Sequence, residues 1–506
     1  MKRKILYSTL VFLAFLFLAE SAARLVEWSI SRKAQAAELS PGWQERFFAL
    51  SFGWHEPDPD LLWRFRANIS NRFIRTNSGH LIGDELPGRK APGSVRVLLL
   101  GDSSPVGLGL KSYRFAFGEL LRHQLEAEFG PQTTVELVNA SVSGYSSEQM
   151  ARVLELNGRR YDPDLVILFS GNNDASISGA TGDRDLLEGQ KLKAFRKTIA
   201  ISAVYRLLKS AVLACMSYEE QSSPLVVRVT PDRFGENLAR MADLCRRLTC
   251  PLIVLQPPIP RLWPAGLQFK VFTDVTGSDG ELIFPPEIRR ILGRQVRYCI
   301  SPDMFDDLYG KGDVFTRLVF SSASRDSLPP EASIRRLSAL VQRQPESPIL
   351  HNNLGVSLWQ AEEYRQADHH LRMARELFMS ADGRDLGPAE LAAGSVFLYN
   401  IGVNLLTEAG CYPAADPAFG CTTAYQYLDS ALQADYLSLR IKREYRDQID
   451  RIGNREDVFV VDLPNLFRRH GGETLFIDHC HPTREGHLLI AEELFHLIRD
   501  SSLIRP

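Results

Sequence analysis

Five short apolar runs, separated by segments of helical periodicity, constrain the fold of this 506-residue chain more than any other feature. A strand that is covered on both faces of a parallel sheet is apolar along nearly its whole length, as these runs are. Alternation of such strands with helices predicts an α/β domain with a five-stranded, parallel, doubly wound sheet. The runs are "VRVLLLGDS" (95–103), "TTVELVNASV" (133–142), "PDLVILFSGNND" (163–174), "PLIVLQPP" (251–258) and "DVFVVDL" (457–463).

The segments between the runs carry the residue types that begin and end helices. Ser146 or Ser147 is placed to cap a helix that continues to about residue 161, and Thr230 precedes Pro231 at the start of another. Gly130 follows an amphipathic segment and is expected to end it. A last helix is expected from about 483 to 498, which closes the domain.

A long helical insertion separates the fourth strand from the fifth, and it contains an internal repeat. "NNLGVSL" at 352–358 returns as "YNIGVNL" at 399–405, an offset of 47, whereas "ADHHLRMA" at 367–374 returns as "AYQYLDSA" at 424–431, an offset of 57. The ten additional residues therefore lie between the two helices of the second copy. These boundaries divide the α/β domain into residues 95–264 and 440–506, around a helical insert at 265–439.

The first copy of the repeat resembles a tetratricopeptide repeat, because its small and apolar residues have the spacing of that helix pair. A generic helical hairpin is the alternative, since two copies are fewer than the three that normally support such an array. The resemblance implies a surface on which a partner protein can bind. The matching residues are Leu354, Gly355, Tyr364, Ala367, Leu371 and Ala374.

The N-terminus combines three cations with an apolar run from Ile5 to Leu18, which indicates a membrane segment. Residues 1–28 form either an uncleaved transmembrane anchor or a removable signal peptide, because small residues follow the run. In both cases the cations favour a cytoplasmic N-terminus and an extracytoplasmic remainder. We therefore expect a single-pass protein of the inner membrane with its large part in the periplasm, joined through an irregular lead-in at 36–94.

Charge and cysteine content narrow the partners and cofactors. Lys and Arg (59) nearly balance Asp and Glu (61), so there is no large basic field and nucleic acid is not an expected partner. The seven cysteines show no C-x-x-C pair and no zinc-finger spacing. Cys411 and Cys421 flank the ten-residue excursion, and in an oxidising compartment they can close it as a disulfide.

Three of the predicted strands end in polar residues that suit acyl transfer. Ser103 follows the first strand, Gly144 the second and Asn173 the third. Carboxyl ends of parallel strands form the edge at which doubly wound folds bind ligands, so these residues are expected on one rim. A serine there can be a nucleophile, and a glycine-turn N–H with a side-chain amide can bind an oxyanion. Each residue alone is also ordinary in a turn.

"FIDHCHPTREGH" at 476–487 follows the last strand and contains candidates for the general base. Asp478 and His481 are three residues apart, so the carboxylate can orient an imidazole whose other nitrogen faces Ser103. The competing interpretation is a metal site at His479, Cys480 and His481, which this segment leaves short of the usual four ligands. We therefore predict no metal and no cofactor, and His487 is expected to cap or pack the last helix.

Together these motifs resemble the SGNH hydrolase superfamily of GDSL-type esterases, which has a flavodoxin-like sheet. The resemblance rests on "GDSS", "SVSGYSS", "GNND" and "DHCHPT", and Ser104 replaces the leucine of the first block. It implies a triad of Ser103 as nucleophile, His481 as base and Asp478 as its partner. It also implies an oxyanion hole formed by Ser103 N–H, Gly144 N–H and the Asn173 amide.

The expected function is therefore hydrolysis of an acyl or acetyl ester of a glycan or lipid by a membrane-anchored serine esterase. Acetyl transfer to a cell-surface polysaccharide by the same triad is an alternative. A non-catalytic scaffold that binds a protein partner through the helical insert is another, although such a scaffold has no need of all five site residues.

Overall fold

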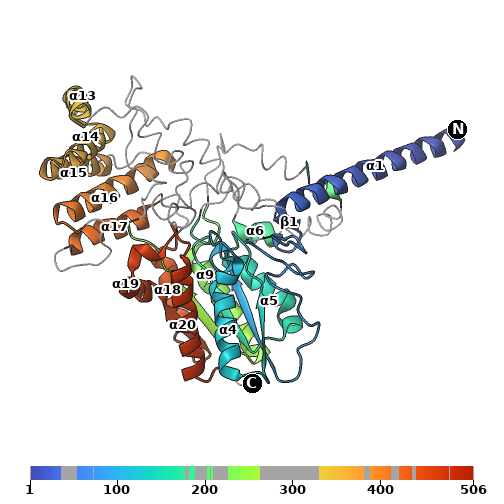
Figure 1. Ribbon diagram of the computed structural model, residues 1–506. Helices are drawn as coiled ribbons and strands as arrows, with labels where there is room; N and C mark the ends of the chain where they lie inside the picture. The colour runs from blue at the N-terminus through green and yellow to red at the C-terminus, as the bar shows by residue number, and fades with distance from the viewer. Residues whose placement is uncertain are drawn as a thin grey trace.

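The computed structural model describes most of the chain, and Figure 1 shows its arrangement. The described residues are 2–35, 54–71, 73–176, 182–188, 202–205, 207–208, 226–262, 330–380, 388–411, 421–435, 440–477 and 479–504. They comprise a sheet with helices on both faces, a group of helices at one end, and one long N-terminal helix that extends away from the rest.

The five predicted strands form one parallel sheet, so the predicted fold class is confirmed. The spatial order is β4-β3-β5-β6-β7, in which the first strand of the domain lies between the second and the third. Successive strands are therefore added on opposite sides of β3: β4 lies on one side and β5 on the other. Doubly wound folds bind ligands at the point where the strand order reverses in this way. The strands are β3 (Ser94–Gly101), β4 (Thr134–Asn139), β5 (Leu165–Phe169), β6 (Leu252–Gln256) and β7 (Val458–Asp462).

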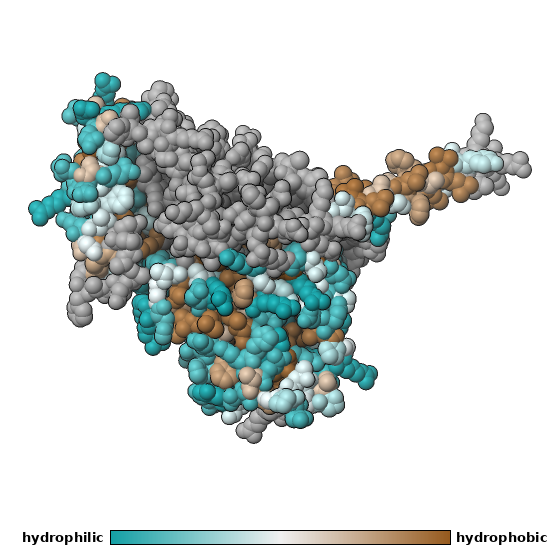
Figure 2. Space-filling view, viewed as in Figure 1, coloured by the Kyte–Doolittle hydropathy of each residue, from teal (hydrophilic) through white to brown (hydrophobic). Residues whose placement is uncertain are grey.

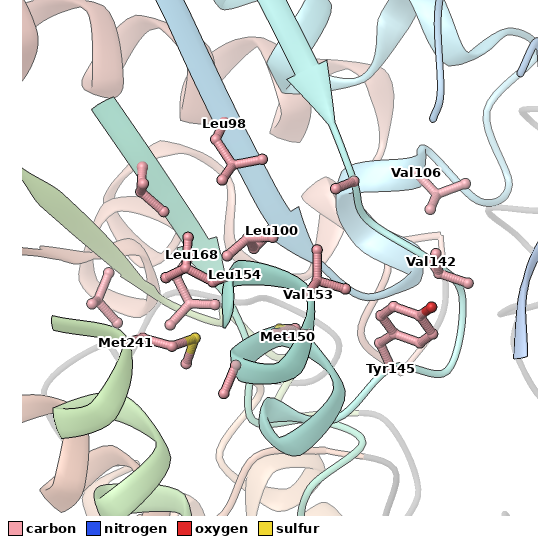
Figure 3. Packing of buried hydrophobic residues seen from close by; sticks show 14 of the residues in the cluster. Leu98, Leu100, Val106, Val142, Tyr145, Met150, Val153, Leu154, Leu168 and Met241 are labelled. Carbon is pink, nitrogen blue, oxygen red and sulfur yellow. The ribbon is translucent and has the colours of Figure 1, made fainter. Parts of the chain in front are cut away.

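Both faces of the sheet are buried, which explains why the strands are apolar along their length. Leu98 and Leu100 of β3 point to one face, and Val97 and Leu99 to the other. The first face is covered by α5 (Ser147–Tyr161), α9 (Pro231–Leu248) and α18 (Arg443–Ile452). Figure 3 shows Leu98, Leu100 and Leu168 packed toward side chains of α5 and α9. The second face is covered by α4 (Phe117–Phe129), α19 (Leu463–His470) and α20 (Arg484–Asp500).

The helices begin and end close to the predicted residues. Ser146 is the N-cap of α5, and its backbone N–H donates to the Gln149 side chain. Thr230 caps α9 ahead of Pro231, and Gly130 follows the last residue of α4. These local signals are satisfied within each helix, which is why they could be located without knowledge of the tertiary contacts.

The insert between β6 and β7 is helical in its described part. Its helices are α13 (Pro330–Arg343), α14 (Pro348–Gln360), α15 (Tyr364–Ser380), α16 (Pro388–Glu408) and α17 (Thr422–Ala434). The first part of the predicted insert, residues 265–329, lies outside the described residues.

The sequence repeat corresponds to a repeated helix contact. In the first copy, a Cβ placed on Gly355 would lie 2.7 Å from Leu371 Cγ, so α14 approaches α15 closely. In the second copy, a Cβ on Gly402 would lie 2.9 Å from Leu428 Cγ, which gives α16 and α17 the same contact. These are the glycine and leucine positions that the repeat aligns, and the small residue is required because the backbones are close.

The second hairpin of the insert contacts the chain just beyond β6. Tyr399 Oη donates to the carbonyl oxygen of Leu262 at 2.7 Å, and the Arg261 guanidinium stacks over the Tyr425 ring. Cys411 and Cys421, which precede and begin the second helix of that hairpin, are joined by a disulfide. The disulfide therefore joins the two ends of the loop within the hairpin, and the contacts of Tyr399 and Tyr425 join the hairpin to the α/β domain.

The lead-in is more regular than the sequence suggests. β1 (His55–Asp58) and β2 (Leu62–Phe65) pair as an antiparallel hairpin, with His55 opposite Phe65. Its turn is closed by the Asp58 carboxylate, which accepts from the backbone N–H groups of Asp60 and Leu61. The strands are four residues each, too short for a recognisable period-two pattern, so the sequence pattern predicts an irregular segment there.

The N-terminal helix α1 (Lys2–Gln35) extends beyond the predicted segment of 1–28. Its span from Tyr7 to Ser29 has 23 residues and a mean hydropathy of 1.9, and almost none of it is buried against the protein. Figure 2 shows this helix as an apolar projection. At 1.5 Å per residue the span is about 34 Å long, enough to cross a hydrocarbon core of about 30 Å. A signal sequence has the same composition.

Candidate active site

Ser103 stands at the C-terminal edge of the sheet, directly after β3. It is the first residue of the short helix α3 (Ser103–Val106), for which Asp102 is the N-cap and accepts from Ser104 N–H at 2.9 Å. The preceding turn is tight, because a Cβ on Gly101 would lie 2.4 Å from Pro105 Cγ. This strand-to-helix turn fixes the serine at the rim, where its side chain is only partly buried.

His481 lies next to Ser103, although 378 residues separate them in the sequence. Its Nε2 is 2.7 Å from Ser103 Oγ. The histidine is held by a closed loop before α20, in which Ile477 N–H donates to the His481 carbonyl and Thr483 N–H to that of Leu475, each at 2.8 Å. The predicted third member of the triad, Asp478, lies outside the described residues.

Asn173 joins the turns that follow three different strands. Its Nδ2 donates to the Tyr145 carbonyl at 3.2 Å, in the turn after β4, and to Asp102 Oδ2 at 3.4 Å, beside Ser103. Gly144, in that same turn, has a φ of +83°, a conformation that favours glycine. The structure thus brings the predicted residues Ser103, Gly144 and Asn173 to one rim.

Two residues that sequence analysis did not single out support the Gly144 turn. Trp63, on the lead-in hairpin, donates from Nε1 to the Ser143 carbonyl at 3.1 Å, and its ring lies 3.3 Å from where a Gly144 Cβ would be. Arg228 donates from Nη1 to the Gly144 carbonyl at 2.8 Å and also binds Asp183, at the start of α6 (Asp183–Glu188). No local pattern marks these residues, because they act through contacts about 80 residues apart.

Two buried carboxyl groups lie beneath the site. Burial raises the pKa of Asp102 to about 6, against the hydrogen bond from Ser104 N–H and the nearby His481. Burial likewise raises the pKa of Asp174 to about 6, although Ser147 N–H and Ser170 Oγ donate to it. Both groups therefore gain protons more easily in the folded protein than in the unfolded chain.

His487 is a packing residue of the last helix, as expected. Its Nδ1 accepts from Phe117 N–H at 3.2 Å and its ring stacks on the Phe117 ring. Burial lowers the pKa of His487 to about 3, so the imidazole is neutral near neutral pH. Its role is to accept a hydrogen bond from the first backbone N–H of α4 rather than to exchange protons.

His479 and Cys480, which the triad does not use, lie against the proposed base. Cys480 Sγ is 3.2 Å from His479 Nε2 and 3.7 Å from His481 Nδ1. All three side chains are buried, with at most 6% of each residue exposed. The sequence interpretation gives these two residues no role, but the fold turns both toward His481.

The arrangement suits nucleophilic catalysis at a carbonyl carbon. An imidazole nitrogen within hydrogen-bond reach can take the serine proton during attack. The Gly144 turn and the Asn173 side chain lie at the same rim as Ser103, which is where donors to the developing oxyanion are needed.

Comparison with known proteins agrees with this geometry. Residues 99–272 match the GDSL-like Lipase/Acylhydrolase family. The chain therefore carries a GDSL-like lipase/acylhydrolase domain. The matched range contains Ser103, Gly144 and Asn173, and it ends before the described helices of the insert and the His481 loop. No curated protein matches the chain.

Several solved structures are similar to it at low sequence identity. The chain is 21% identical to TesA, over 33% of this chain and 62% of that one, with a TM-score of 0.21. It is 19% identical to the psychrotrophic esterase EstA from Pseudoalteromonas sp., over 33% and 61%, with a TM-score of 0.20. The enzyme LAE5 from the metagenome of Lake Arreo, Spain, is 13% identical over 81% and 97%, with a TM-score of 0.29. The chain thus spans about three fifths of the first two proteins.

Proposed function

We propose that this protein is a membrane-anchored serine esterase that hydrolyses an acyl or acetyl ester of a glycan or a lipid. The observation that carries the proposal is the 2.7 Å approach of His481 Nε2 to Ser103 Oγ at the strand rim. The GDSL-like domain match supports the same assignment. Asp478 is proposed to orient His481, as in other Ser-His-Asp sites.

The reaction proceeds in two halves. Ser103 Oγ attacks the ester carbonyl while His481 Nε2 takes the hydroxyl proton. The oxyanion that forms is proposed to accept hydrogen bonds from Ser103 N–H, Gly144 N–H and the Asn173 amide. Collapse expels the alcohol, which His481 protonates. Water then attacks the acyl-serine by the same route in reverse and releases the acid.

The proposed location is the outer side of a membrane. Three cations, Lys2, Arg3 and Lys4, precede the apolar span of α1 and favour a cytoplasmic N-terminus. The Cys411–Cys421 disulfide supports an oxidising compartment, because such bonds seldom persist in the cytosol. Single-pass insertion in an inner membrane, with the catalytic domain in the periplasm, agrees with both features.

The insert is proposed to lie beside the active site and to take no part in the catalytic steps. Its repeated hairpins follow β6 at the catalytic edge of the sheet, and the returning chain binds next to Asn173, where Ile441 N–H donates to the Asn172 side chain at 2.9 Å. We propose that this tetratricopeptide-like insert forms a wall of the substrate site or binds a protein partner.

Hydrolysis of short p-nitrophenyl esters by Ser103→Ala tests the assignment. The rate is expected to fall at least about a thousandfold, because the acyl intermediate can no longer form. Ser104→Ala is the matched control, since Ser104 lies in the same turn and its hydroxyl is bonded to the Cys480 carbonyl instead. A Ser103→Ala protein as active as wild type would refute the triad. Acyl transfer to an added glycan that outruns release of free acid would favour a transferase.

A further inference from the structure

We propose that Trp63 is a positioning residue for the reaction, because its indole N–H fixes the direction in which the Gly144 N–H points. The inference rests on the proposed function, in which the Gly144 N–H binds the oxyanion. Trp63 belongs to β2 of the lead-in hairpin and lies outside residues 99–272, which match the GDSL-like family. The hairpin that precedes the α/β domain is then a part of its active site.

Gly144 is the third residue of a type II turn. Tyr145 N–H donates to the Val142 carbonyl at 3.1 Å, which closes the turn between these two residues (Figure 3). Gly144 has a φ of +83°, whereas Ser143 before it does not have a positive φ, and this combination is that of type II. In a type I turn the central peptide, which joins Ser143 to Gly144, is rotated by about 180°, so its C=O and N–H exchange sides.

Trp63 holds this central peptide in the type II orientation. Its Nε1 donates to the Ser143 carbonyl at 3.1 Å. In a planar trans peptide the C=O and the N–H point in opposite directions, so the bond to the indole directs the Gly144 N–H away from Trp63. The Gly144 N–H has no acceptor among the described residues, and it is therefore available to an oxyanion. Rotation to type I would break the indole bond and turn the Gly144 N–H toward Trp63.

The indole is itself held in place by contacts with the turn and with Arg228. The Tyr145 hydroxyl donates to the Trp63 carbonyl at 2.7 Å, so the turn binds the backbone of the hairpin. The Arg228 guanidinium lies over the Trp63 ring, 5.6 Å from its centroid. The same guanidinium donates to the Gly144 carbonyl at 2.8 Å, which fixes the peptide on the other side of Gly144. A donor that is supported in this way can orient a catalytic group with little freedom to move.

Steady-state kinetics of the full chain in detergent, with a short p-nitrophenyl ester, test the inference. Trp63→Phe keeps an aromatic ring beside Gly144 but removes the indole N–H. It is expected to lower kcat about 10- to 100-fold, which is less than the loss of a whole oxyanion donor. KM should stay within about threefold of wild type, because the donor is needed for charge that develops only in the transition state. A residue that served only the packing of the hairpin would not give this separation of kcat from KM.

Two further variants separate the N–H from the rest of the side chain. Replacement of Trp63 by benzothienylalanine, which has nearly the same shape with sulfur in place of the N–H, should lower kcat as Trp63→Phe does. Trp359→Phe is the matched control, because its Nε1 donates to Thr407 Oγ1 at 3.0 Å within the insert, so the same kind of bond is lost there. Its kcat should equal that of wild type.

The outcomes distinguish this inference from the proposed function. A wild-type kcat in either Trp63 variant, or an equal fall in Trp359→Phe, would overturn the positioning role while the esterase assignment stands. A wild-type chain that neither hydrolyses the ester nor reacts with a fluorophosphonate at Ser103 would overturn the proposed function, and this inference with it.

Discussion

Gly144 has a backbone conformation and a close neighbour that both favour glycine at this position of the site. Its φ of +83° is costly for a side chain, and the Trp63 ring occupies the space beside it. Gly144→Ala is therefore expected to lower kcat/KM for an ester about 10- to 100-fold, because it moves the proposed oxyanion donor. It should also lower the free energy of unfolding by about 1 kcal/mol.

Gly130→Ala separates these two effects. Gly130 has a φ of +76° at the end of α4, and a Cβ on it would meet nothing within 4 Å. It should lose similar stability while its ester kinetics stay at the wild-type level. If both variants lost activity equally, backbone strain and not the rim geometry would be responsible.

The buried carboxyl of Asp174 makes stability depend on pH. Its pKa is raised from 3.8 to about 6, so the folded state holds the proton more tightly than the unfolded state. That contribution to stability is complete below pH 3.8 and is lost as pH rises through 6, a change of about 3 kcal/mol. Asp174→Asn, which keeps an acceptor for Ser147 N–H, should therefore gain on wild type between pH 4 and 7 in chemical denaturation. A stability difference that did not vary with pH would contradict this.

At the scale of elements, the sequence predicts the strands and helix ends that are marked by local residue patterns. The five strands and the caps at Ser146, Thr230 and Gly130 were predicted because apolar runs and capping residues act within a few positions. The support of the Gly144 turn by Trp63 and Arg228 was not, since it depends on how distant segments pack. The orientation of His479 and Cys480 could not be predicted from the sequence either, because it is set by the closed loop around His481.

The close approach of α16 and α17 gives a prediction for the insert. Gly402→Ala places a Cβ 2.9 Å from Leu428 Cγ and 3.1 Å from the Ala424 carbonyl, neither of which can move freely. Such overpacking costs about 1–3 kcal/mol and should lower the thermal midpoint of the chain. Gly235→Ala in α9 is the matched control, because the three atoms nearest to its Cβ all belong to the flexible Gln448 side chain. Equal thermal midpoints for the two variants would show that α16 and α17 can move apart without loss of stability.

At the scale of the whole molecule, α1 is expected to keep the protein in a membrane. An apolar span of 23 residues exposed to solvent is unfavourable unless lipid covers it. The full chain should therefore remain in the membrane pellet after an alkaline carbonate wash, whereas a chain that begins after Gln35 should not. Recovery of the protein in the supernatant, with its N-terminus removed, would indicate a signal peptide instead.

The proposed catalysis depends on a serine that is activated by a histidine 378 residues away. The most direct test is labelling of the full chain with a fluorophosphonate probe, followed by peptide mapping, for wild type, Ser103→Ala and His481→Ala. We predict labelling of wild type at Ser103, none in Ser103→Ala, and a rate at least about 100-fold lower in His481→Ala. Undiminished labelling of Ser103→Ala, or of Ser103 in the absence of His481, would contradict the account.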